Sequence, residues 1–271
     1  MGEKAGSRIK ALIFDWAGTT VDHGSLAPVL TLERVFTEAG VPLEQSVIRR
    51  DMGLAKLDHI TRLLQEPETI AAWTAAYGAP PSTKVAAQLY EAFLPLQMEC
   101  LLTYSHVLRG VPEAISHFSE MGMRVGSTTG YTRAMLDALV ESARGEGYTP
   151  EIAMSPEDAG AGRPSPAMCF EICRRFGLDA MDCIKIGDTP SDIAEGRNAG
   201  MWTIGITRTG NMVGLDEAGW DALDSEAQAG KLRQASAELL EKGAHLVAES
   251  VAECAPAVEK IMQRVLHGEL P

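Results

Sequence analysis

The sequence KALIFDWAGTT, residues 10–20, decides the fold of this chain. Its apolar run ALIF leads directly into Asp15 and then into Gly18, which is the pattern of a buried parallel strand that ends in a loop. The segments MRVGSTTGYT, residues 123–132, and CIKIGDTPSD, residues 183–192, repeat this arrangement. Each segment therefore predicts a buried strand with polar side chains at its carboxyl end.

Further strands and intervening helices extend the pattern. GMWTIGIT, residues 200–207, predicts another strand, and AHLVAES, residues 244–250, is a weaker candidate. Helical patterns lie between the strands, each closed by a glycine after its last turn: PEAISHFSEMG, TRAMLDALVESARG and SPAMCFEICRRFGL. Strands that alternate with helices predict the α/β class with a doubly wound parallel sheet. Active sites of such sheets lie at the carboxyl ends of the strands.

The stretch from residue 22 to residue 104 differs from the rest, because it is almost entirely helical in pattern and has no convincing strand. Four of its segments together predict four or five helices: LAPVLTLERVFTEAG, SVIRRDMGLAKLDHITRLLQ, PETIAAWTAAYG and STKVAAQLYEAFLPLQMECLL. We therefore expect an α-helical cap domain at residues 22–104, inserted into an α/β core domain formed by residues 1–21 and 105–271.

The chain is acidic, with a formal net charge of −13 over its 271 residues. This charge argues against a nucleic-acid partner, since binding to a phosphate backbone relies on clustered Lys and Arg. No apolar run approaches the roughly 20 residues that span a bilayer, and the start MGEKAGSRIK lacks the apolar stretch of a secretory signal. We therefore expect a cytoplasmic protein without a nucleic-acid or membrane partner.

The first two strand ends carry candidate catalytic groups. Asp15 follows its apolar run directly, so its carboxylate should face the crevice of the sheet, although a turn aspartate would fit equally well. At the second strand end, Thr128, Thr129 and Gly130 offer hydroxyl and backbone N–H groups that could hold a phosphoryl oxygen. Taken alone, such a Ser/Thr/Gly cluster is usually just a loop.

The third strand end and the segment before it carry charges. Asp188 and Asp192 are four residues apart across a strand-to-helix turn, and two hard carboxylates near a phosphate suit Mg²⁺. An acidic helix start is the alternative, because Asp favours the helix dipole. Arg163, in AGRPSP, would fix a cation beside the phosphate and the nucleophile, and a surface arginine is the alternative.

The order DWAGT, TTGYT, GRPSP, GDTPSD resembles the haloacid dehalogenase superfamily over nearly the whole chain. The resemblance implies that Asp15 forms an aspartyl-phosphate, that Thr129 holds a phosphoryl oxygen, and that Arg163 replaces the usual lysine. It also implies that Mg²⁺ binds Asp15, Asp188 and the Ala17 carbonyl, with Asp192 supporting the metal through water.

One position departs from the common superfamily pattern D-x-D, in which the second Asp protonates the leaving group and later activates water. That position is Ala17, which can do no acid–base work. The substitution makes a plain phosphate-ester hydrolase less favoured and fits a leaving group that is not an oxygen.

The helical stretch supplies the remaining candidates in RRDMGLAKLDHI. Met52, Lys56 and His59 stand at spacings of four and three, so we expect them on one helix face, where a cap could close over the phosphoryl site. A solvated lysine is the alternative. DWAGTTVD together with MGLxKxDH resembles the phosphonoacetaldehyde hydrolase family, in which the matching lysine forms an imine with the substrate aldehyde. The resemblance gives His59 a role in moving the proton.

This chemistry requires Lys56 to be neutral near pH 7, with a pKa well below its ordinary value of about 10.4. A protonated imine would then act as the electron sink for cleavage of a carbon–phosphorus bond. The nearest rival is a capped phosphatase or phosphoglucomutase of the same superfamily. A catalytically silent binding protein would be expected to lack Asp15 or Asp188, and both are present.

Two further residues and the oligomeric state complete the expectations. Ser25 lies at the junction to the helical stretch, where we expect a hinge or turn and a contact to the phosphonate. Tyr131 lines the pocket or simply packs. The resemblance implies a small-molecule phosphonate substrate and a homodimer formed through the inserted helices.

Overall fold

The computed structural model describes residues 9–271 and contains one parallel sheet. Its strands are β1 (Ala11–Phe14), β2 (Arg124–Thr128), β3 (Ile152–Met154), β4 (Cys183–Gly187), β5 (Trp202–Ile206) and β6 (Leu246–Ala248). They follow the spatial order β3-β2-β1-β4-β5-β6, and every neighbouring pair is parallel. β2 and β3 lie on one side of β1, and β4, β5 and β6 lie on the other. The strand order therefore reverses at β1, and the crevice of such a sheet lies at this switch point. The weak strand candidate at residues 244–250 is present as β6.

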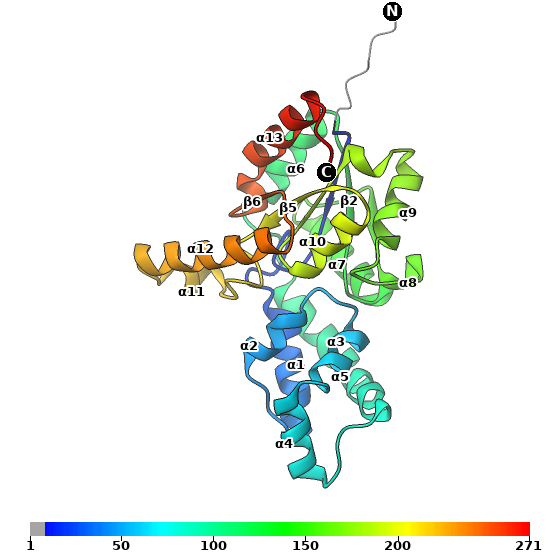
Figure 1. Cartoon of the computed structure of the whole chain (residues 1–271), viewed down its shortest axis with the longest axis vertical. Helices are drawn as coiled ribbons and strands as arrows, with labels where there is room; N and C mark the ends of the chain where they lie inside the picture. Colours follow the sequence, from blue (N-terminus) through cyan, green and yellow to red (C-terminus); the bar gives the residue numbers. More distant parts are fainter. Residues whose placement is uncertain (1–8) are drawn as a thin grey trace, which may run out of the picture.

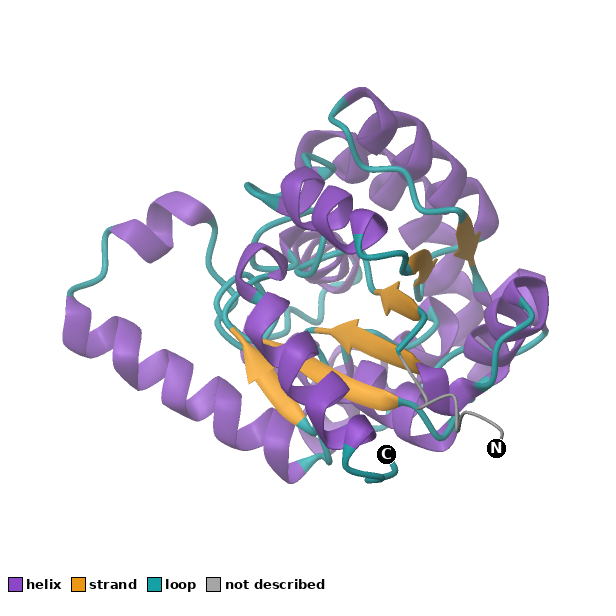
Figure 2. Cartoon of the chain, turned by 90° about the horizontal axis from the view of Figure 1, so that it is seen from above, coloured by secondary structure: helices purple, strands orange, loops and turns teal. Residues whose placement is uncertain are grey.

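Helices cover both faces of the sheet (Figures 1 and 2). One face carries α6 (Val111–Glu120), α7 (Arg133–Gly145) and α13 (Ala255–Leu266), and the other carries α9 (Ala167–Phe176), α10 (Pro190–Asn198) and α12 (Ser225–Glu241). Shorter helices, α8 (Pro156–Ala159), α11 (Glu217–Asp221), η2 (Ala180–Asp182) and η3 (Val251–Glu253), lie in the connections.

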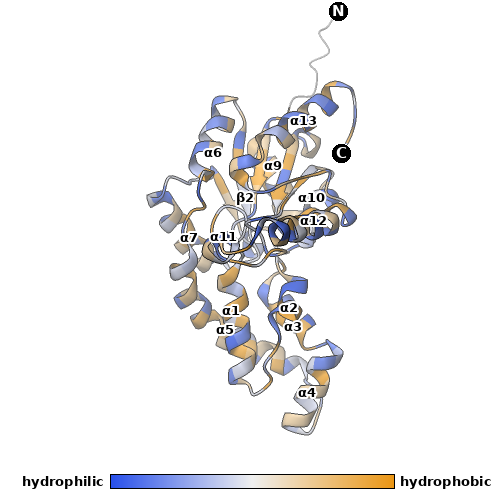
Figure 3. Ribbon diagram, turned by 90° about the vertical axis from the view of Figure 1, so that its left-hand side faces the viewer, coloured by the Kyte–Doolittle hydropathy of each residue, from blue (hydrophilic) through white to orange (hydrophobic). Residues whose placement is uncertain are grey.

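The strands are buried along their length, as expected for a sheet covered on both faces. Side chains of β1 alternate between two apolar clusters: Leu12 and Phe14 pack with the α6, α7 and α13 side, whereas Ala11 and Ile13 pack against α9. Figure 3 shows this apolar interior along the strands. The predicted fold class, an α/β protein with a doubly wound parallel sheet and an inserted helical segment, is confirmed.

Five of the six α-helices between β1 and β2 lie below the sheet in Figure 1. They are α1 (Leu26–Glu38), α2 (Gln45–Ile48), α3 (Lys56–Leu63), α4 (Pro67–Tyr77) and α5 (Thr83–Tyr104). Helices α1 and α5 pack against each other, with Phe36 and Phe93 fully buried. Among residues 9–271, no helix combines the length and the apolar character needed to cross a bilayer.

The segment between α2 and α3 differs from the expectation that Met52, Lys56 and His59 lie on one helix face. A short 3₁₀-helix, η1 (Arg49–Asp51), follows α2, and Met52 leaves it in an extended conformation. Gly53 then adopts φ +89°, which ends any helical run, and α3 begins at Lys56. The expectation that Met52 shares a helix face with Lys56 and His59 was therefore wrong, because a glycine turn separates Met52 from α3.

Candidate active site

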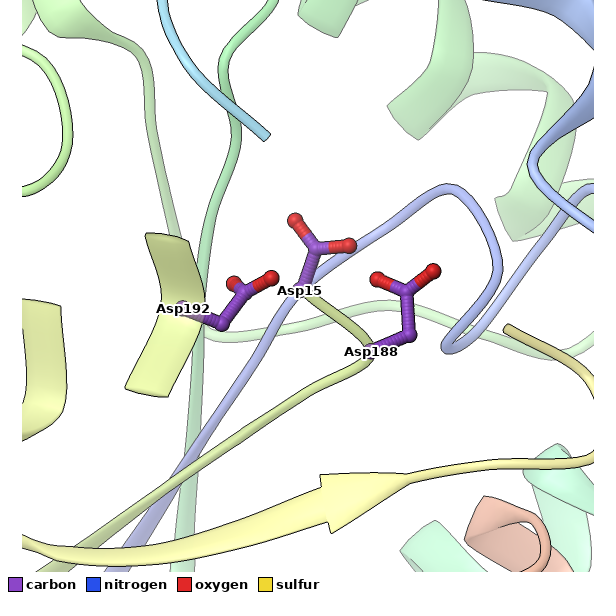
Figure 4. Close-up of side chains that lie close together, drawn as sticks. All are labelled: Asp15, Asp188 and Asp192. Atoms are coloured by element: carbon purple, nitrogen blue, oxygen red, sulfur yellow. The ribbon is translucent and has the colours of Figure 1, made fainter. Parts of the chain in front are cut away.

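Asp15 lies immediately after β1, at the switch point of the sheet. Its backbone N–H donates to the Ile186 carbonyl on β4 at 2.8 Å, which fixes the residue between two strand ends, and the residue is 5% exposed. Asp188 follows β4, and Asp192 lies in the first turn of α10. One carboxylate oxygen from each of these three residues lies within 4.8 Å of the others, and Figure 4 shows the carboxylates of Asp15 and Asp188 side by side.

The loop after Asp15 approaches Asp188 closely. Gly18 has φ +81°, and a Cβ on it would overlap the Asp188 carboxylate, so glycine is required there both for the backbone conformation and for space. The Thr19 hydroxyl lies 3.5 Å from an Asp15 oxygen and 3.4 Å from an Asp188 oxygen. The loop therefore presents polar groups to both carboxylates.

Asp15 and Asp188 form an acidic site that fits Mg²⁺, and Ala17, the residue expected to offer its carbonyl, lies beside them. Both aspartates are buried, and all three residues line one small cavity. Burial, together with the neighbouring Asp15, raises the pKa of Asp188 well above its ordinary value. A bound divalent cation would relieve this burial and repulsion of like charges, and hard carboxylate and carbonyl oxygens are the donors that Mg²⁺ prefers.

Asp192 uses both of its oxygens on protein donors. One oxygen accepts from Lys185 Nζ at 2.8 Å and lies 3.0 Å from Arg163 Nη1. The other accepts from the Thr189 hydroxyl at 2.6 Å and from its backbone N–H at 3.2 Å. Burial alone would raise the pKa of Asp192, but the Arg163 and Lys185 charges outweigh it and lower the pKa. Asp192 does not line the cavity, and its support of a metal stays a prediction.

Arg163 is the buried cation beside the nucleophile. Its Nη2 lies 2.7 Å from Asp15, and its Nε donates to Glu195 at 3.0 Å. Burial opposes its charge, but Asp192, Asp15 and Glu195 raise the pKa of Arg163 well above its ordinary value, so it stays protonated. The predicted position of a cation next to Asp15 matches this arrangement.

Thr128 belongs to the same buried network. Its hydroxyl donates to Glu195 at 2.9 Å and accepts from Arg163 at 2.8 Å. Thr128 does not line the cavity, so the structure does not bring it to the position expected for a substrate contact. The reason is that its hydroxyl is turned toward the charges beneath the site.

Lys185 and Glu195 are functional candidates that the sequence analysis missed. Both are fully buried, and Lys185 Nζ lies 3.5 Å from Glu195 Oε2. Two signals could have found them. Lys185 interrupts an apolar strand, CIKIG, and Glu195 follows Asp192 by three residues, so it lies on the same face of α10.

The small cavity above Asp15 gathers most of the predicted residues. Ten of them line it: Asp15, Ala17, Ser25, Met52, Lys56, Thr129, Gly130, Tyr131, Arg163 and Asp188. The other predicted residues, His59, Thr128 and Asp192, lie outside its lining. Residues from the helical segment and from three strand ends therefore meet at one place.

Lys56 enters this cavity from the first turn of α3 and is 5% exposed. Its Nζ lies 3.8 Å from the Met52 sulfur and 5.4 Å from the centre of the Tyr131 ring. Burial lowers the pKa of Lys56 to about 8, with Arg163 adding to the shift and Asp15 opposing it. The amine is therefore neutral in a substantial fraction of molecules near neutral pH, as imine chemistry requires.

His59 lies one turn from Lys56 and is fully buried. Its Nε2 lies 2.8 Å from the Ile48 carbonyl, so Nε2 carries the proton and donates. Its Nδ1 has no hydrogen-bond partner among the described residues. Burial, with the nearby Lys56 charge, lowers the pKa of His59 to about 3. The ring is neutral at pH 7, and its role in moving a proton stays a prediction.

The Thr129–Tyr131 turn and Ser25 complete the walls of the cavity. The Thr129 hydroxyl accepts from the Tyr131 backbone N–H at 3.1 Å, and a Cβ on Gly130 would lie 2.5 Å from the Leu54 carbonyl oxygen. Glycine thus lets the segment before α3 rest directly on the second strand end. Ser25 is 2% exposed and takes φ +51° at the start of α1, which matches the turn expected at this junction.

Family comparisons agree with this geometry. The profile of the haloacid dehalogenase-like hydrolases matches residues 9–200, and a second profile of that type matches residues 160–254. Over 264 residues, the chain is 38% identical to the phosphonoacetaldehyde hydrolase of Bacillus thuringiensis (strain Al Hakam), covering 97% of this chain and 98% of that protein. It is 39% identical to the enzyme of the same name from Hahella chejuensis, covering 97% and 90%.

Solved structures agree in fold. A phosphonoacetaldehyde hydrolase-like protein from Oleispira antarctica superposes with a TM-score of 0.96 at 34% identity, covering 100% of this chain and 99% of that one. A putative β-phosphoglucomutase from Bacteroides vulgatus superposes with a TM-score of 0.66 at 18% identity, covering 97% and 92%. The second similarity concerns the fold alone.

Proposed function

Because this chain belongs to the phosphonoacetaldehyde hydrolase family of the haloacid dehalogenase-like hydrolases, we propose that it hydrolyses the carbon–phosphorus bond of phosphonoacetaldehyde. The products are acetaldehyde and inorganic phosphate. The observation that carries the proposal is the position of Lys56, a buried amine with a lowered pKa that lines the same cavity as Asp15. Hydrolysis of a phosphate ester requires no imine, and therefore no neutral amine at this position.

The reaction begins at the aldehyde. Neutral Lys56 attacks the carbonyl carbon, water leaves to give an imine, and the imine nitrogen takes up one proton from solvent, which gives a protonated imine. Asp15 then attacks phosphorus in line, and the electron pair of the carbon–phosphorus bond moves into the imine to give an enamine. Without this sink the carbon would leave as a carbanion, so Lys56 lowers the barrier of the bond cleavage.

Two waters complete the cycle. One attacks the aspartyl-phosphate, which releases phosphate and restores the Asp15 carboxylate. The enamine takes a proton at carbon, and the second water hydrolyses the resulting imine to free Lys56 and release acetaldehyde. No proton has to reach a leaving oxygen at the position of Ala17, which fits a side chain without acid–base capacity.

Other residues of the site stabilise the charge of the phosphoryl group and of the Asp15 nucleophile. Arg163, 2.7 Å from Asp15, lies where it can neutralise the phosphoryl oxygens, and the Thr129 hydroxyl lies at the neighbouring strand end. Asp15, Asp188 and the Ala17 carbonyl would hold Mg²⁺, which supplies positive charge against the phosphoryl group. Burial and Asp192 raise the pKa of Asp15 while Arg163 opposes them, so added positive charge favours the ionised nucleophile.

We also propose that residues 22–104 act as a cap domain and that the protein works in the cytoplasm. We propose further that it forms a homodimer through the helices of this domain. In α4, Ile70 and Tyr77 are 37% and 56% exposed, which offers apolar surface for a second copy. Sedimentation equilibrium of the protein and of its Tyr77→Asp variant tests the dimer. A monomeric wild-type protein would exclude it.

The activity is tested by phosphate release from phosphonoacetaldehyde, with p-nitrophenyl phosphate as a comparison substrate. The proposal predicts turnover of the phosphonate, and its loss in Lys56→Arg and in Asp15→Asn. Faster turnover of the ester than of the phosphonate, with Lys56→Arg fully active, would favour a capped phosphatase instead.

A further inference from the structure

Arg49 connects the helical segment to the core beside the active site. It lies in η1, between α2 and α3, and its guanidinium donates to backbone and amide oxygens of other segments. Nη1 donates to the Gly24 carbonyl at 2.8 Å and to Asn211 Oδ1 at 3.0 Å, and Nη2 donates to the Gly214 carbonyl at 3.2 Å. A residue of the helical segment is thus held by the linker after β1 and by the loop after β5.

Asn211 is the core residue that pairs with Arg49. It is 1% exposed, and its Nδ2 donates to the Arg49 carbonyl at 3.0 Å, so Arg49 and Asn211 form a reciprocal pair. The Asn211 backbone N–H donates to Asp188 Oδ2 at 2.7 Å. One core residue therefore touches both the helical segment and a carboxylate of the site.

Arg49 also stands at the beginning of the segment that presents Lys56. The Met52 backbone N–H donates to the Arg49 carbonyl at 3.3 Å, and the Met52 sulfur lies 3.8 Å from Lys56 Nζ. At the other side of the turn, Leu54 rests on Gly130. If Arg49 lost its core contacts, this segment would keep only packing contacts to the core, those of Gly53 with Thr189, of Leu54 with Gly130 and of Ala55 with Gly162.

We propose that Arg49 and Asn211 form a latch that holds residues 49–56, the segment that presents Lys56, closed over Asp15. Arg49 is a positioning residue, because its guanidinium contacts the core rather than the cavity, which it does not line. Asn211 also donates to Asp188. Closing the latch therefore fixes the position of Lys56 relative to the carboxylate of Asp188. This role rests on the proposed function for its effect on turnover, but closure itself does not depend on the substrate.

The neighbouring Arg50 gives a matched control. It carries the same charge one residue later, but it pairs with Glu66 within the helical segment at 3.2 Å and its side chain is 54% exposed. Replacing Arg50 by alanine removes an arginine from η1 without touching a contact to the core.

The first experiment measures the access of Lys56 without substrate. Wild type, Arg49→Ala, Asn211→Ala and Arg50→Ala are methylated with formaldehyde and cyanoborohydride, and the rate at Lys56 is followed by peptide mass spectrometry. The latch predicts a rise of about tenfold in Arg49→Ala and Asn211→Ala, the order expected when hydrogen bonds of a charged group are lost, and no change in Arg50→Ala. Equal rates in all four folded proteins would overturn the latch.

The second experiment measures turnover of phosphonoacetaldehyde. The latch predicts a raised KM and a lowered kcat in Arg49→Ala, partial recovery in Arg49→Lys or with added guanidinium, and wild-type values in Arg50→Ala. Unchanged kinetics in Arg49→Ala would overturn it. A third outcome separates the two proposals. If wild type does not cleave the phosphonate, but its Lys56 is still methylated more slowly than Lys56 of Arg49→Ala, the proposed function fails and the latch stands. Circular dichroism checks folding, and Asn211→Ala replaces Arg49→Ala should the latter unfold.

Discussion

The most informative prediction concerns the charge of Lys56, and the perturbation is pH. Burial places the pKa of Lys56 at about 8 instead of 10.5. At pH 7 a pKa of 8 leaves about one-tenth of the amine neutral, whereas an ordinary lysine would leave roughly 0.03%, a difference of about 300-fold. Because only the neutral amine attacks an aldehyde, imine formation should rise about tenfold per pH unit below pH 8 and level off above it.

The assay measures the initial rate at which cyanoborohydride reduces the imine that Lys56 forms with phosphonoacetaldehyde. It covers pH 6 to pH 10 and is corrected for the pH dependence of the reductant. Lys56→Arg supplies the background, because arginine remains protonated throughout this range. A rate that continues to climb tenfold per unit up to pH 10 would refute the reasoning, since the amine would then behave as if solvated.

Three further predictions concern the carboxylates of the site and the contact between Gly130 and Leu54. Chelation should abolish phosphate release and Mg²⁺ should restore it in wild type but not in Asp188→Asn; full activity in excess chelator would exclude the metal. Glu195→Ala should remove one of the buried carboxylates that balance Arg163 and Lys185 and lower the free energy of unfolding by about 3–5 kcal/mol, measured by urea denaturation, and an unchanged midpoint would show that Glu195 is dispensable for stability. Gly130→Ala should raise KM, because its Cβ would overlap the backbone carbonyls of Gly53 and Leu54 and force the segment before α3 to move, and wild-type kinetics would contradict this close approach.

The strand ends could be predicted from the sequence because their physical signal is local. Asp15 and Asp188 each follow an apolar run, and parallel strands bring such ends together at one edge of the sheet. Lys56 was different. Its spacing alone did not distinguish it from a solvated lysine, and the family resemblance was needed to connect it with the aldehyde.

Other features could not be predicted, because they depend on distant parts of the chain. Arg49 and Asn211 are separated by 162 positions, and no pattern around either residue indicates the other. Thr128 sits at the expected strand end, yet Glu195 draws its hydroxyl away from the cavity. Met52 was misplaced because the turn at Gly53 overrides the helical spacing on both sides of it.

The central claim is that one amine of the helical segment bonds to the substrate carbon above Asp15. Mass spectrometry of the protein reduced with borohydride in the presence of phosphonoacetaldehyde tests it directly. The account predicts an added two-carbon group, either ethyl or phosphonoethyl, on the peptide that contains Lys56, together with irreversible loss of activity. An unmodified Lys56 peptide from protein that has turned over substrate, or the added mass on a different lysine, would contradict it.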